Sequence, residues 1–168
     1  AATVKDRAAD NTVVVSPHHV SLAAGAGAAD IISVAGYPTG RHHTLIKASE
    51  ARLAIQSGAS EVWVSLDETV ADANAVLSEL IAIREACPDP ARLGLIVPEA
   101  VGADAADAAD AADAAVTAAH QAGYQRLIVR SSAAVNNEES DSGEEDMKKG
   151  PALAAAKLPV LKFPAAAV

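Results

Sequence analysis

A single stretch of this sequence, residues 32–66, contains a complete strand–loop–helix–strand unit and narrows the possible folds. A run of strand-forming residues leads into the loop Gly-Tyr-Pro-Thr-Gly at residues 36–40, and an amphipathic helix then ends at Gly58. A second apolar run follows the helix directly. Two strands joined through a helix are parallel, because a parallel pair needs a long crossover connection. Repeated units of this kind build α/β sheets and barrels.

The same alternation runs through the rest of the chain. Apolar runs predict strands at residues 12–16, 31–37, 61–66, 93–97, 127–130 and 158–163, and the segments between them predict helices at 20–29, 44–57, 70–86 and 104–122. The predicted strands are almost continuously apolar, as strands buried on both faces are. A chain of 168 residues can bury one core. We therefore expect one α/β domain over residues 1–168, with about six strand–helix units.

Composition excludes several classes of partner. The net charge of −9 argues against nucleic acid and against an anionic membrane surface. No apolar stretch is long enough to cross a membrane, and no signal-peptide pattern is present. The one cysteine, Cys87, precludes an internal disulfide and fits a reducing compartment, so we expect a cytoplasmic protein.

Two acidic segments resemble cation sites only superficially. Four aspartates recur every third residue in the predicted helix 104–122, at Asp104, Asp107, Asp110 and Asp113. Steps of three advance about 300° around a helix, so these carboxylates spread over half of its surface instead of converging. A solvated outer face is the better interpretation. The acidic run at residues 136–150 lacks the spacing of a calcium loop and is expected to be a mobile, solvated loop. We expect no metal site.

Three motifs of the first unit match a known family. They are Gly36-Tyr37-Pro38-Thr39-Gly40, Lys47-Ala48-Ser49-Glu50, and Gly58-Ala59-Ser60-Glu61-Val62-Trp63. In these motifs the chain resembles the deoxyribose-phosphate aldolases, which are class I, Schiff-base aldolases on a (β/α)8 barrel. The resemblance implies a partial or degenerate TIM barrel that keeps about six of eight strand–helix units. It also implies a lyase that cleaves 2-deoxyribose 5-phosphate to glyceraldehyde 3-phosphate and acetaldehyde without a cofactor.

The positions that would carry this reaction have been replaced. The family's Schiff-base lysine falls on Ile128, or on Arg130 if a short insertion is allowed, and neither side chain can form an imine. The proton-transfer aspartate is Trp63, and the lysine of the fourth strand falls on Gly94. A phosphate-binding glycine is Ala133. We therefore expect a non-catalytic relative with a binding or assembly role.

One lysine remains at a position that matches the family. Lys162 lies in the last predicted strand, where the family carries a second lysine. A Schiff base needs an unprotonated amine, which a neighbouring cation such as Arg130 favours. An active aldolase or other lyase that uses Lys162 with Arg130 is therefore the alternative function, with Ser131 and Ser132 as candidate phosphate-binding residues. Two further interpretations are an anion-binding pair of the same two cations and a Lys162 that reaches solvent.

The histidines occur as two adjacent pairs in predicted loops, His18-His19 and His42-His43. Adjacent residues of an extended backbone point in opposite directions, so neither pair alone chelates a metal. A pair formed by His18 and His42 would lack a third ligand. We expect solvated loop histidines.

Two expectations concern packing. Lys47 and Glu50 are one helical turn apart and predict an i,i+3 ion pair on the outer layer, whereas the indole of Trp63 is expected to fill the interior of the barrel. A barrel that lacks two strands has open edges. Either a homo-oligomer covers those edges, or the sheet stays open, or the missing strands belong to sequence beyond this chain. A sugar phosphate is the expected small-molecule partner.

Overall fold

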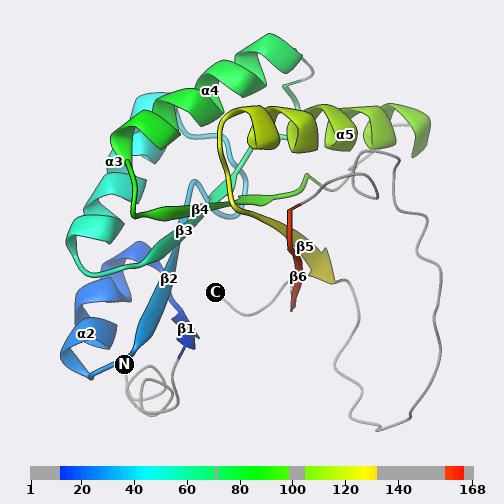
Figure 1. The fold of residues 1–168 in the computed structure, drawn as a ribbon. Coiled ribbons are helices and arrows are strands. Elements are labelled where there is room, and N and C mark those ends of the chain that lie inside the picture. The colour runs from blue at the N-terminus through cyan, green and yellow to red at the C-terminus, as the bar shows by residue number, and fades with distance from the viewer. Residues whose placement is uncertain (1–11, 71, 99–104, 132–157, 165–168) are drawn as a thin grey trace, which may run out of the picture.

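Figure 1 shows the computed structural model of the chain, which describes residues 12–70, 72–98, 105–131 and 158–164. The strands are β1 (Thr12–Val14), β2 (Asp30–Ala35), β3 (Glu61–Ser65), β4 (Arg92–Ile96), β5 (Arg126–Ser131) and β6 (Val160–Pro164). The helices are the short 3-10 helix η1 (Pro17–His19), α2 (Val20–Gly25), α3 (Thr44–Gln56), α4 (Ala73–Ala86) and α5 (Ala105–Gln121).

The six strands form one sheet in sequence order, and every neighbouring pair is parallel. The sheet curls, and the helices lie on its outer face (Figure 1). Strands β1 and β6 are the two edges of the sheet. The predicted α/β fold, a partial (β/α)8 barrel with about six units, is therefore confirmed.

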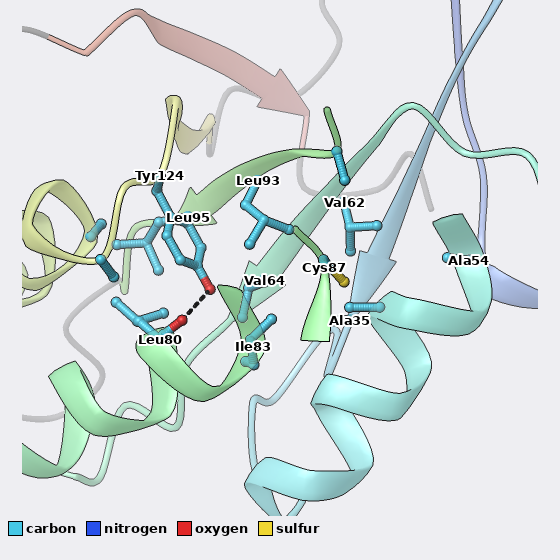
Figure 2. Packing of buried hydrophobic residues seen from close by; sticks show 14 of the residues in the cluster. Ala35, Ala54, Val62, Val64, Leu80, Ile83, Cys87, Leu93, Leu95 and Tyr124 are labelled. Carbon is cyan, nitrogen blue, oxygen red and sulfur yellow. Dashed lines mark hydrogen bonds between the residues drawn. The ribbon is translucent and has the colours of Figure 1, made fainter. Parts of the chain in front are cut away.

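The main hydrophobic core lies between the outer face of the sheet and the helices. Figure 2 shows side chains of β3 and β4 pointing toward α3 and α4; the labelled residues include Val62, Val64, Leu93, Leu95, Ala54, Leu80 and Ile83. Helix α3 contributes only alanines among its buried apolar residues, at Ala48, Ala51 and Ala54. Small side chains on that face let the helix approach the sheet closely, which explains how a core with so few aromatic residues is filled.

A second, smaller cluster lies on the inner face of the sheet. It consists of Ile32, Val34, Trp63, Ile96 and Ile128, all buried. These residues alternate along their strands with residues of the main core, as side chains on opposite faces of a strand do. The inner cluster fills the interior of the partial barrel with apolar side chains.

The predicted boundaries are close to the observed ones, and the exceptions have local causes. The helix predicted at 20–29 ends at Gly25, shortly before Gly27 takes a left-handed conformation with φ of 82°. The helix predicted at 70–86 starts at Ala73, because the Asp72 carboxylate accepts a hydrogen bond from the backbone N–H of Asn74 and caps it.

Three further predictions are only partly testable on the described residues. On α5, Asp110 is exposed and Asp113 is half-buried, so a solvated face is seen at Asp110. Asp104 and the acidic run at residues 136–150 lie outside the residues that the structure describes. Within the part of the chain that is described, no helix is long and apolar enough to span a membrane.

Candidate functional site

The carboxyl ends of the strands and the inner face of the sheet are the candidate site, because barrel active sites form at that end. Trp63 occupies the inner face at mid-height. Its side chain is 3% exposed, and its Nε1 donates a hydrogen bond of 2.7 Å to Glu61 Oε1. The prediction that Trp63 packs in the interior is confirmed.

Trp63 lies beside a glycine that leaves room for it. Gly94 is its register partner on β4. A Cβ at Gly94 would lie 2.7 Å from Trp63 Cδ1 and 2.5 Å from Ile128 Cδ1, which is closer than real Cβ contacts allow. The indole therefore occupies the space that a side chain at position 94 would need.

Below Trp63, a group of charged residues lies at the amino ends of β2 to β5. Glu61 is fully buried, and its Oε2 lies 3.3 Å from Arg92 Nε and 3.4 Å from Arg126 Nη1. Arg92 Nη2 also pairs with Asp30 Oδ1 at 2.9 Å. Two guanidinium groups thus compensate the buried carboxylate. In TIM barrels the reaction takes place at the carboxyl end of the strands, and residues at the amino end serve the stability of the fold. We therefore assign this charged group to stability.

Above Trp63, the loop at residues 36–40 follows β2 at the carboxyl end of the sheet. Lys47 Nζ donates hydrogen bonds to Gly40 O at 2.7 Å and Ser65 O at 3.4 Å, and it also pairs with the Glu79 carboxylate. Glu50 Oε2 accepts a hydrogen bond of 2.8 Å from the backbone N–H of Gly36. The predicted outer-layer ion pair between Lys47 and Glu50 is therefore wrong. Both side chains turn instead toward the loop.

The turn after β3 carries a hydrogen-bonded carboxylate. Asp67 Oδ1 accepts hydrogen bonds from Thr69 N at 2.9 Å and Thr69 Oγ1 at 2.7 Å, and Arg41 Nε lies 3.5 Å away. The bonds from Thr69, assisted by the charges of Arg41 and Lys47, hold the pKa of Asp67 below 3.8, its ordinary value. Asp67 is therefore ionised at neutral pH and fixes this turn.

The predicted catalytic residues lie on neighbouring strands. In the register of β5 and β6, Lys162 is paired with Val129, and Arg130 with Phe163. Ser131 is the last residue of β5 and is paired with Pro164. Ser132 lies outside the described residues. The register brings the backbones of Arg130 and Lys162 together at adjacent positions, and the roles of both residues stay predictions.

The histidines have local structural partners. Ser16 Oγ and His19 Nδ1 are 2.8 Å apart, and His43 Nδ1 accepts a hydrogen bond of 3.2 Å from Leu45 N at the start of α3. Both His18 and His42 are exposed. Among the residues that the structure describes, no group of three or more His, Cys, Asp or Glu side chains could hold a metal ion.

Sequence reasoning missed three counterions of two buried charged residues. Glu79 on α4 is the counterion of Lys47, and Arg92 and Arg126 are the counterions of Glu61. A signal for the second group is present in the sequence, since Glu61, Arg92 and Arg126 each immediately precede an apolar run. First residues of adjacent parallel strands meet at one edge of the sheet, so opposite charges there are expected to pair.

Comparisons with known proteins agree with the geometry. No protein-family model matches the chain. A deoxyribose-phosphate aldolase of Corynebacterium glutamicum is 50% identical over 98 residues, which are 55% of this chain and 44% of that protein. A deoxyribose-phosphate aldolase of Nocardia farcinica is 43% identical over 77 residues, which are 44% of this chain and 35% of that protein.

A solved structure is similar as well. The crystal structure of a candidate deoxyribose-phosphate aldolase from Coccidioides immitis superposes with a TM-score of 0.63 and 28% sequence identity. The match covers 76% of this chain and 50% of that one. The chain therefore matches no more than half of the length of these relatives.

Proposed function

We propose that this chain, which belongs to the deoxyribose-phosphate aldolase family over the part that it spans, is a non-catalytic member with a binding or assembly role. The observation that carries the proposal is the position of Trp63. Its indole lies buried in the interior, bonded to Glu61 and packed over Gly94. By the resemblance, this is where the family carries a proton-transfer aspartate.

The chemistry of the inner face supports this proposal. A Schiff-base aldolase needs an amine to attack the substrate carbonyl and a group that moves protons. The indole N–H of Trp63 is a donor only, and it is already bonded to Glu61 Oε1. Ile128, one of the two candidates for the nucleophile position, is fully buried in the inner cluster and has no amine.

The second candidate function is an active lyase that uses Lys162 with Arg130. It rests on the resemblance of the last strand and not on the register, because Lys162 is paired with Val129 and Arg130 with Phe163, and successive positions of a strand alternate between the two faces of the sheet. In this reaction the Lys162 amine adds to the substrate carbonyl carbon and water is released as the imine forms. Ser131 and Ser132 would then bind the phosphate of the sugar phosphate.

Borohydride trapping separates the two functions. The protein is incubated with acetaldehyde and sodium borohydride, and its intact mass and peptides are then measured. The non-catalytic proposal predicts no reduced adduct and no glyceraldehyde 3-phosphate released from 2-deoxyribose 5-phosphate. An adduct on Lys162 that is absent from the Lys162→Met variant would contradict this proposal and support the lyase.

A binding role and an assembly role differ in their response to ligand. A sugar phosphate that binds only the native state raises its Tm with concentration, whereas a chain that serves only in assembly shows no shift. The probe is 2-deoxyribose 5-phosphate, and the control is the Arg130→Gln variant, which removes one predicted anion-binding charge.

We also propose a cytoplasmic location, which the free, buried Cys87 supports because structural disulfides are rare there.

A further inference from the structure

Lys47 is a fully buried charged residue on the helix that follows the loop at residues 36–40. Burial of an unpaired ammonium group is costly, so a lysine in such a place requires several partners. Its partners come from three different segments: Gly40 O in the loop, Ser65 O at the end of β3, and the Glu79 carboxylate on α4. One side chain therefore connects the loop, the sheet and a second helix.

Glu50 acts on the other end of the same loop. It lies one turn after Lys47 on α3, and its Oε2 accepts a hydrogen bond from Gly36 N at 2.8 Å. The loop also has an internal hydrogen bond of 2.8 Å from Gly40 N to Gly36 O. One helix thus contacts the first and the last residue of the loop, and the loop itself is closed between these two points.

The backbone conformation and the close packing of the loop both require glycine at positions 36 and 40. Gly36 and Gly40 have positive φ angles of 70° and 68°. A Cβ at Gly36 would lie 2.5 Å from Lys47 Cδ, and a Cβ at Gly40 would lie 2.0 Å from the backbone carbon of Leu66. The loop is therefore packed directly on the Lys47 side chain and on Leu66 after β3, with no space for a side chain at either glycine.

We infer that Lys47 and Glu50 are positioning residues that together fix the loop at residues 36–40 and, through it, Tyr37. Tyr37 is half-buried and packs against the inner cluster that contains Trp63. The two side chains thereby set the shape of the carboxyl end of the partial barrel, from the helix outside it. This role does not depend on whether the interior catalyses a reaction.

Hydrogen exchange of backbone amides, read by mass spectrometry at the loop peptide, tests the inference. Lys47→Met keeps the length of the side chain but removes its charge and its hydrogen bonds. Because a bond to a charged group is worth more than a neutral one, we expect exchange at residues 36–40 to become about tenfold faster or more. Exchange in β4 and β5 should stay unchanged. The matched control is Ser49→Ala, a change at an exposed position of α3 between the two residues.

The segments in which amide exchange becomes faster distinguish a positioning role from a general stabilising role. A residue that only stabilises the fold would accelerate exchange in β4 and β5 as much as in the loop, and that result would overturn the inference for Lys47. If Lys47→Met fails to fold, Glu50→Ala decides, since it removes a half-buried group and should release Gly36 N alone. Unchanged exchange of the loop in Glu50→Ala would also overturn the inference.

Discussion

At the scale of single residues, the inner cluster depends on the absence of a side chain at position 94. Gly94→Ala would place a Cβ 2.5 Å from Ile128 Cδ1 and 2.7 Å from Trp63 Cδ1. Overpacking of this kind typically costs about 1–3 kcal/mol. We expect the free energy of unfolding, measured with urea, to fall by about that amount. Gly25→Ala is the control, because no atom lies within 4 Å of a Cβ at that position.

A double-mutant cycle tests whether the contact itself is the cause. Ile128→Val removes Cδ1, the nearest atom to the added Cβ, so Gly94→Ala should cost less in that background. A coupling energy of about 0.5 kcal/mol or more is expected for residues in contact. Strict additivity of the two substitutions would contradict the close packing of Ile128 against Gly94.

The sequence could predict the burial of some residues but not the partners of others. The burial of Trp63 follows from its size and from its place in an apolar strand. The interpretation of Lys47 was wrong because helical spacing reports only local neighbours, and Glu50 was the nearest acid along α3. The true counterion, Glu79, is 32 residues away in sequence and is brought near only when α3 and α4 pack together.

At the scale of elements, the central strands β2, β3 and β4 could be predicted because they are buried on both faces and therefore have few polar residues. The contacts between helices could not be predicted in the same way. Tyr124 illustrates this, since it follows α5 but its Oη donates a hydrogen bond of 3.4 Å to Leu80 O on α4 (Figure 2). Only the packing of α4 beside α5 brings these two groups together.

Tyr124 predicts a loss of stability at alkaline pH. Burial raises the pKa of Tyr124 far above its ordinary value of 10.0, so the folded state keeps the phenolic proton while the unfolded state loses it. The stabilisation that this raised pKa of Tyr124 gives is fully present below pH 10. As pH rises above 10, the free energy of unfolding decreases by up to about 1.4 kcal/mol per pH unit. Burial also raises the pKa of Cys87 above its ordinary value of 9.0, which adds a decrease of stability in the same direction.

Urea unfolding as a function of pH checks this prediction. Tyr124→Phe should cost about 1 kcal/mol at neutral pH, because it removes a hydrogen bond, and should flatten the decrease above pH 10. The contribution of Cys87 remains in both proteins and cancels in the comparison. An equal slope for the variant and the wild type would mean that Tyr124 does not carry the alkaline effect.

At the scale of the whole molecule, the six strands curl without closing, and β1 and β6 each have one unpaired side within the described residues. Exposed edges of a sheet bind other strands readily. The predicted homo-oligomer would cover these edges, with β1 of one copy beside β6 of another. Two copies related by a twofold axis could join both pairs of edges in a closed, symmetric assembly.

The variant Val14→Pro tests this assembly on the unpaired side of β1. Val15 N donates to Ile32 O at 2.9 Å, and adjacent N–H groups of a strand point in opposite directions. The N–H of Val14 therefore points away from β2, and its loss leaves the sheet of one copy intact.

Light scattering after size exclusion should give a dimer for the wild type and a monomer for Val14→Pro. Val15→Pro, which instead breaks the bond to β2, should destabilise the fold itself. A wild-type chain that is monomeric at every concentration tested, or a Val14→Pro variant that still dimerises, would rule out pairing through β1.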